Sequence, residues 1–159
     1  MVDLLASVST NASDGMKSNC VSFLSCTNTL GSSVVFQDQT IPDAEDAISE
    51  YAVPTITGGL AGEPIHAISL GYKATSWFHL LSVESTCFFF LCRNVYMFRK
   101  LLSEHPDPSL KRISIIGIGG VNSKEAVARM RRVGASAVAC ATALGMHGVD
   151  VFRKLNEGL

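Results

Sequence analysis

The sequence predicts an α/β fold with parallel strands, and the second half of the chain carries the clearest pattern. Residues 113–116, Ile-Ser-Ile-Ile, form a mostly apolar run that leads directly into the glycine turn at 117–120, which is typical of a buried parallel strand. An apolar run followed by a small-residue turn recurs at 135–145. A helix is expected between these strands and an amphipathic one at 149–159, and this order predicts a parallel βαβ unit.

The helix between the two strands has clear start and stop signals. Asn122 and Glu125 have the spacing of a capping box, with Asn in place of Ser or Thr. Gly134 supplies the stop. The expected apolar face consists of Ala126, Val127, Met130 and Val133.

The first half of the chain is less regular. Short strands are expected at 21–27 and 32–36, joined by a polar turn. The acidic stretch 37–51 is interpreted as a surface connection. Residues 58–64 are expected to form a glycine-rich loop, and a helical pattern begins behind it at 65–71.

Composition excludes several classes of protein. The chain has 159 residues, of which 47% are hydrophobic and 17% charged, which suits a packed core and argues against disorder. Its 13 basic and 14 acidic residues give a net charge of −1, which argues against a nucleic-acid surface. No signal peptide is evident, so a cytoplasmic protein is expected. The cysteines lack a CxxC pair, and we expect reduced thiols with neither disulfides nor a metal site: Cys20, Cys26, Cys87, Cys92 and Cys140.

The segment 72–93 differs in composition from the rest of the chain. It holds the single Trp and the triple Phe at 88–90. His79 and Glu84 interrupt its apolar stretch, which makes it a poor membrane span, and no membrane partner is expected.

Glycine and small-residue turns follow both C-terminal strands. Glycine lets backbone N–H groups approach a ligand closely, and the start of the next helix favours an anion. In eight-stranded α/β barrels, the loops after the last strands often hold a phosphate in this way. The alternative is that both are tight turns without a ligand.

Longer strings add a family resemblance. VSFLSCTNTLG (21–31), GGLAGEPIHAISLG (58–71) and IIGIGGVNSKEAVARMRRVGA (115–135) resemble the flavin-dependent dihydroorotate dehydrogenases, especially the soluble class 1 type. The resemblance covers the chain except 72–93. It implies that residues 1–159 are the C-terminal portion of a TIM (β/α)8 barrel, about its last three βα units.

The resemblance also implies site residues. FMN would contact Thr27, Gly62, Gly119, Gly120, Ala141 and Thr142, with Ala141 in place of the glycine usual in the family. A side chain at Gly119 is expected to fill the space where the phosphate meets the backbone. Asn28 and Thr29 match the pair that holds the dihydroorotate or orotate ring, and an amide suits the alternating donors and acceptors of a pyrimidinedione.

No catalytic residue is assigned. The family's cysteine base and flavin lysine belong to earlier strands than this chain contains, and Cys26 does not match the base position. The resemblance implies FMN-dependent oxidation of dihydroorotate to orotate in pyrimidine biosynthesis, with fumarate as acceptor, a homodimer and a cytoplasmic location. This chain alone is expected to be inactive. Alternatives are another flavin barrel oxidoreductase, such as a dihydropyrimidine dehydrogenase-like domain, and a non-catalytic remnant.

The resemblance also suggests an origin for segment 72–93. The family pattern joins Gly71 directly to Asn94 across one helix. Our hypothesis is a retained intron translated in frame, coupled with an internal Met taken as the start. The alternative is a genuine family insertion in a surface loop.

Overall fold

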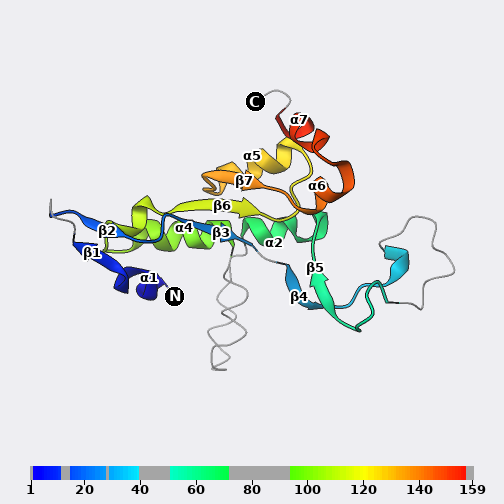
Figure 1. Ribbon diagram of the computed structural model, residues 1–159, viewed down its shortest axis with the longest axis horizontal. Coiled ribbons are helices and arrows are strands. Elements are labelled where there is room, and N and C mark those ends of the chain that lie inside the picture. Colours follow the sequence, from blue (N-terminus) through cyan, green and yellow to red (C-terminus); the bar gives the residue numbers. More distant parts are fainter. Residues whose placement is uncertain (1, 12–14, 28, 40–50, 72–93, 157–159) are drawn as a thin grey trace.

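The core of the fold is a three-stranded parallel sheet, seen in the computed structural model of Figure 1. The structure describes residues 2–11, 15–27, 29–39, 51–71 and 94–156. The central strand β6 (Ser114–Ile118) lies between β3 (Phe23–Cys26) and β7 (Ala137–Ala139). The helix α5 (Lys124–Arg132) connects β6 to β7, which confirms the predicted parallel βαβ unit.

Helices cover one face of this sheet. The helix α2 (His66–Leu70) and the helix α4 (Val95–Glu104) lie end to end alongside β6 (Figure 1). A Cβ atom added to Gly117 would lie 2.9 Å from Met130 Sδ on α5 and 3.4 Å from Val95 Cγ2 on α4. The helices α4 and α5 therefore pack on the same side of β6, where the main core lies.

The two faces of β6 are covered unequally. Ile113 and Ile115 are fully buried beneath the helices, whereas Ile116 and Ile118 on the other face are half-buried. The sequence predicts that β6 is buried on both faces, but in the structure only the face toward the helices is fully buried. A mixed α/β fold with a parallel sheet and one incompletely covered apolar face is consistent with part of a barrel, in which further strands would enclose that face.

The helix α5 begins one residue later than its capping pattern suggests. Ser123, not Asn122, is the N-cap, because the Ser123 hydroxyl accepts a hydrogen bond from the Ala126 N–H at 3.3 Å. Hydrogen bonds from its own backbone N–H and from Ser123 lower the pKa of Glu125. The predicted apolar face is confirmed, with Ala126, Val127 and Met130 buried and Val133 half-buried, and Gly134 follows the helix end as predicted.

The end of the chain adds two short helices. The helix α6 (Thr142–His147) follows β7, and α7 (Asp150–Asn156) buries Val151 and Leu155. The predicted closing helix is therefore confirmed. Part of the expected small-residue turn at 140–145 is instead the first turns of α6.

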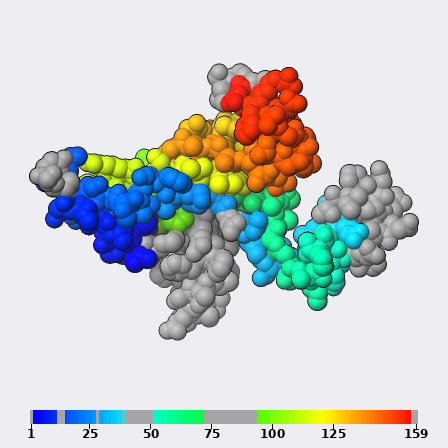
Figure 2. Space-filling model, in the orientation of Figure 1, coloured from blue at the N-terminus to red at the C-terminus, as the bar shows by residue number. Residues whose placement is uncertain are grey.

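The glycine-rich region before α2 is partly a strand, not only a loop. Residues Gly58–Leu60 form β5, which pairs antiparallel with β4 (Leu30–Ser33). The second N-terminal strand therefore begins two residues earlier than the predicted 32–36, and it joins β5 and not the main sheet. Figure 2 shows this part as a lobe that projects from the body of the molecule.

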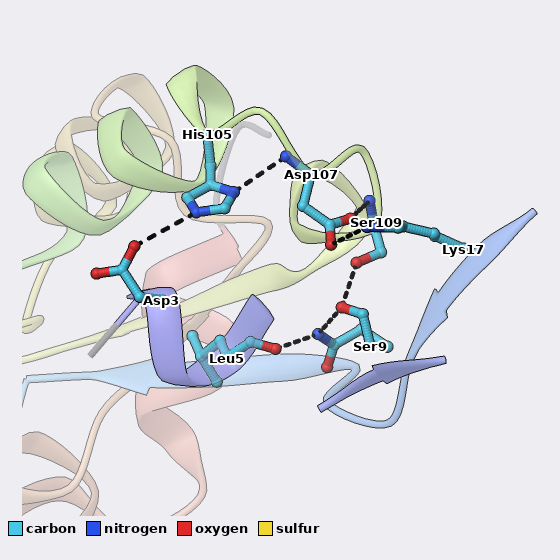
Figure 3. A network of polar contacts seen from close by, with 8 residues as sticks. Asp3, Leu5, Ser9, Lys17, His105, Asp107 and Ser109 are labelled. Carbon is cyan, nitrogen blue, oxygen red and sulfur yellow. Dashed lines mark hydrogen bonds and ion pairs between the residues drawn. The ribbon is translucent and has the colours of Figure 1, made fainter. Parts of the chain in front are cut away.

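An N-terminal unit that the sequence analysis did not predict lies at the opposite end of the sheet. It consists of α1 (Val2–Ser7) and an antiparallel hairpin, β1 (Ser9–Asn11) with β2 (Lys17–Asn19). Asn19 Nδ2 donates to Leu5 O at 2.7 Å and to Ser9 Oγ at 2.9 Å (Figure 3). The Ser9 hydroxyl is hydrogen-bonded to that of Ser109 at 2.8 Å, which ties the unit to the loop before β6.

Asp107 is the main charged group of this network (Figure 3). Its carboxylate accepts the Ser109 N–H at 2.9 Å and forms an ion pair with Lys17 Nζ at 3.2 Å. The hydrogen bonds from Ser109, followed by the charge of Lys17, lower the pKa of Asp107 below its ordinary value of 3.8. Ionised Asp107 therefore holds the N-terminal hairpin against the body of the fold.

This lowered pKa predicts an acid-dependent loss of stability. The contribution of Asp107 is complete above its ordinary pKa of 3.8 and is lost as the pH falls through the lowered value in the folded state. We expect the urea midpoint to fall from neutral pH to about pH 3, and Asp107→Asn to reduce that fall. Asp150→Asn on the exposed surface of α7 is the control. Equal pH dependence in all three proteins would contradict the assignment.

Two parts of the sequence discussed above lie outside the residues that the structure describes. They are segment 72–93, with Cys87 and Cys92, and most of the acidic stretch, 40–50. Within the described residues, no helix is long and apolar enough to cross a membrane.

Candidate functional site

A cleft of about 240 Å³ opens at the carboxyl ends of the three parallel strands. Its walls come from the segments that follow β3, β6 and β7, together with the loop after β5. Ligand sites of α/β folds form at this edge because the connecting loops there are free to carry function. The residues that line the cleft are Thr27, Thr29, Ala61, Gly62, Glu63, Ile65, Ile118, Gly119, Gly120, Val121, Asn122, Ala141, Thr142, Ala143, Met146 and His147.

The cleft brings the predicted ligand residues together. Every residue predicted to contact FMN lies in its wall, namely Thr27, Gly62, Gly119, Gly120, Ala141 and Thr142. Thr29, predicted to bind the substrate ring, lies there too. Its neighbour Asn28 lies outside the described residues. These residues come from sequence segments more than a hundred positions apart, so their convergence is a property of the fold.

The glycine turn after β6 packs directly on α2. Gly119 has φ 130° and Gly120 has φ 63°, a region that residues with a side chain rarely adopt. A Cβ atom on Gly119 would lie 2.8 Å from Ser69 Cβ, and one on Gly120 would lie 2.6 Å from His66 Cβ. We expected a side chain at Gly119 to point into the phosphate space. This is wrong, because the side chain would instead collide with α2.

The opposite wall is formed by Gly62 and the start of α6. A Cβ atom on Gly62 would lie 3.3 Å from Thr142 Cγ2, so the loop after β5 reaches the first residue of α6. Ala141 precedes this helix with φ −114°. Alanine adopts such a negative φ without strain, so the departure from the family's glycine leaves the local backbone intact.

The cleft carries little charge. Glu63 and His147 are the titratable residues in the described lining, which contains no Lys or Arg. Asn122 Nδ2 donates to Glu63 Oε2 at 3.0 Å and so joins the loop after β6 to the loop after β5. An anion would therefore be held here by backbone N–H groups and threonine hydroxyls, without an ion pair to a lysine or an arginine.

Reasoning from sequence missed several residues that shape the site. Glu63 and Asn122 form a bridge at the cleft, and His66 and Ser69 support the glycine turn from α2. Asn122 was expected to cap α5, which its residue type suits equally well. Nothing in the local sequence marks His66 or Ser69, because their partners lie about fifty residues away along the chain.

Glu63 and His147 are the described side chains of the cleft that could act as an acid or a base. The described lining of the cleft contains no cysteine or lysine that could serve as a base or nucleophile. Cys26, at the end of β3, is only 3% exposed and belongs to the hydrophobic core. The convergent glycines and hydroxyls suit a ligand's polar end, where backbone atoms must approach closely.

Comparison with known protein families finds a match to the C-terminal part of the chain. Residues 100–159 match the family model for dihydroorotate dehydrogenase. No curated protein matches the chain. The matched range runs from the end of α4 through α7 and includes Gly119, Gly120, Ala141 and Thr142. The matched residues supply two of the three parallel strands and most of the cleft wall.

Proposed function

We propose that the cleft is the phosphate end of an FMN site in a dihydroorotate dehydrogenase. The enzyme would oxidise dihydroorotate to orotate in pyrimidine biosynthesis, and this chain would form its C-terminal part. The observation that carries the proposal is the convergence of Thr27, Gly62, Gly119 and Thr142 on one cleft at the carboxyl ends of parallel strands. The family match over residues 100–159 supports the same conclusion.

The residues present fit a phosphate group. The glycine turn after β6 and Gly62 bring backbone atoms to the cleft, and Thr142 at the start of α6 adds a hydroxyl group. The cleft of about 240 Å³ is smaller than the roughly 300–1,000 Å³ of a typical whole-ligand pocket. It therefore suits one end of FMN, with the ring system extending toward Thr27 and Thr29.

The role of this chain would be to bind and orient. Bound flavin supplies hydride acceptance, which no amino-acid side chain offers. Gly62, Gly119, Gly120 and Thr142 would hold the phosphate and so fix the position of the ring. Thr29, together with Asn28, would orient the substrate ring by hydrogen bonds to its polar edge. The proton-abstracting base would come from earlier barrel strands. The whole enzyme would be a cytoplasmic homodimer that passes its electrons to fumarate.

A comparison of FMN with riboflavin tests the proposal. Riboflavin lacks the phosphate, so the chain should bind FMN roughly 10- to 100-fold more tightly, as expected for hydrogen bonds to a charged group. The measurement is titration of flavin fluorescence, with inorganic phosphate as a competitor. Dihydroorotate should not be turned over by this chain, because no residue of it matches the family's cysteine base, and loss of a general base costs about a hundred- to ten-thousand-fold. Equal affinity for the two flavins would contradict a phosphate site.

A further inference from the structure

His66 is a buried histidine that joins three elements of the site. It begins α2 directly after the 3₁₀ turn Glu63–Ile65, and only 8% of it is exposed. Its Nδ1 lies 2.9 Å from the backbone oxygen of Gly119 in the glycine turn. Its Nε2 lies 3.1 Å from Nε of Arg129 on α5. The imidazole therefore bridges the glycine turn and the helix that follows it.

The partner on α5 determines the tautomer of this histidine. An arginine side chain has N–H donors and no acceptor, so Arg129 Nε must donate to an unprotonated Nε2. The proton of the neutral ring then lies on Nδ1, and Nδ1–H donates to Gly119 O. The carbonyl of Gly119 is thus fixed toward α2, which sets the orientation of the peptide plane between Gly119 and Gly120.

We propose that His66 is a positioning residue that orients the Gly119–Gly120 peptide toward the ligand in the cleft. The inference rests on the proposed function, in which this turn contacts a phosphate. When the Gly119 carbonyl is held by His66, the N–H of Gly120, on the other side of the same planar peptide, is held in a fixed opposite direction. Ser69 and the Cβ of His66 close the remaining space on the α2 side, so the turn has no room to rotate there.

Two substitutions separate the two hydrogen bonds of the ring. In His66→Asn, the amide nitrogen occupies the bonded position of Nδ1 and can still donate to Gly119 O. In His66→Gln, the amide oxygen reaches the position of Nε2 and can still accept from Arg129. Both variants are smaller than histidine and polar, so they serve as matched controls for each other. If His66 acted only by filling space, the larger Gln would replace it better than Asn, which is the opposite order.

The first measurement is amide hydrogen exchange at Gly119–Asn122 in the chain without ligand, with thermal unfolding recorded for each protein. We expect native-like protection in His66→Asn and clearly faster exchange in His66→Gln. Equal exchange in the two variants, or faster exchange in His66→Asn, would overturn the proposal. If His66→Gln does not fold, His66→Asn decides alone, since native protection supports the proposal and loss of protection overturns it.

The second measurement is FMN affinity by fluorescence titration. We expect affinity close to wild type for His66→Asn and a loss of about tenfold for His66→Gln, the size expected when one buried hydrogen bond is lost. Equal FMN affinity of the two variants would overturn the proposal that His66 orients the turn for FMN binding. If the wild-type chain does not bind FMN, the proposed function fails, and the exchange measurement still decides whether His66 holds the turn.

Discussion

Gly119→Ala is expected to lower the free energy of unfolding by about 2–6 kcal/mol. The φ of 130° costs a residue with a side chain about 1–3 kcal/mol, and forcing a methyl into packed space costs about as much again. The new methyl would lie 2.8 Å from Ser69 Cβ. Ser69 is fully buried and its hydroxyl donates to Ile65 O at 2.9 Å, so it has little freedom to move aside. Urea denaturation of the ligand-free chain measures this loss.

Gly145→Ala is the matched control for this substitution. Gly145 lies within α6, and no atom lies within 4 Å of the position that its Cβ would take. Alanine in a helix is favoured over glycine by roughly 0.5–1 kcal/mol, so this variant should be at least as stable as wild type. A Gly119→Ala protein with unchanged stability and lost FMN binding would show that the methyl points into the cleft and not into α2.

Deletion of residues 72–93, with Gly71 joined to Asn94, is expected to preserve the fold and to raise the soluble fraction several-fold. Gly71 ends α2, and Asn94 caps α4 by accepting the Met97 N–H at 2.9 Å. A Cβ on Gly71 would lie 2.8 Å from Tyr96 Cβ and 3.5 Å from Asn94 Oδ1, so the two helix ends already meet. The removed segment contains an uncharged aromatic run at 88–90, a pattern that promotes aggregation.

The deletion needs a control for chain length. A chain in which 72–93 is replaced by a Gly/Ser linker of equal length tests whether composition or length causes any insolubility. Both altered chains should be soluble, and each should retain FMN when the N-terminal barrel strands are supplied. If the unaltered chain is as soluble as the two altered chains and holds as much flavin, segment 72–93 is a tolerated family insertion. That result would remove the physical support for a translated intron.

The sequence predicts best those elements whose signals are local. The strand β6 and the helix α5 follow from the mostly apolar run at 113–116 and from the 3.6-residue apolar period that ends at Gly134. The N-cap was misplaced by one residue because Asn122 and Ser123 are equally good caps in isolation. In the structure, Asn122 donates a hydrogen bond to Glu63 instead, and Ser123 occupies the N-cap position of α5.

Elements held by distant partners could not be predicted. The strand β5 contains two glycines, and glycine is unfavourable in strands. It forms because Leu60 pairs with Leu30 of β4, a residue far from it in the sequence. The N-terminal hairpin has a polar sequence and is held to the body by Ser9 and Lys17, whose partners Ser109 and Asp107 lie 100 and 90 residues away along the chain. The residue pattern marked the turns at 117–120 and 140–145 as candidate anion sites, and the family resemblance added Thr27 and Gly62. The supports beneath them, such as His66, required the packing of α2 on the glycine turn.

The most direct test of the central claim is to locate FMN on the chain by amide NMR. If the cleft is the phosphate end of the flavin site, FMN should shift the amide resonances of Gly62, Gly119, Gly120 and Thr142 most strongly, and riboflavin should shift them much less. Figure 1 places the N-terminal hairpin at the opposite end of the sheet, so its amides serve as an internal reference that should not move. Shifts concentrated at that hairpin, or equal shifts at the cleft with both flavins, would contradict a phosphate site between these loops.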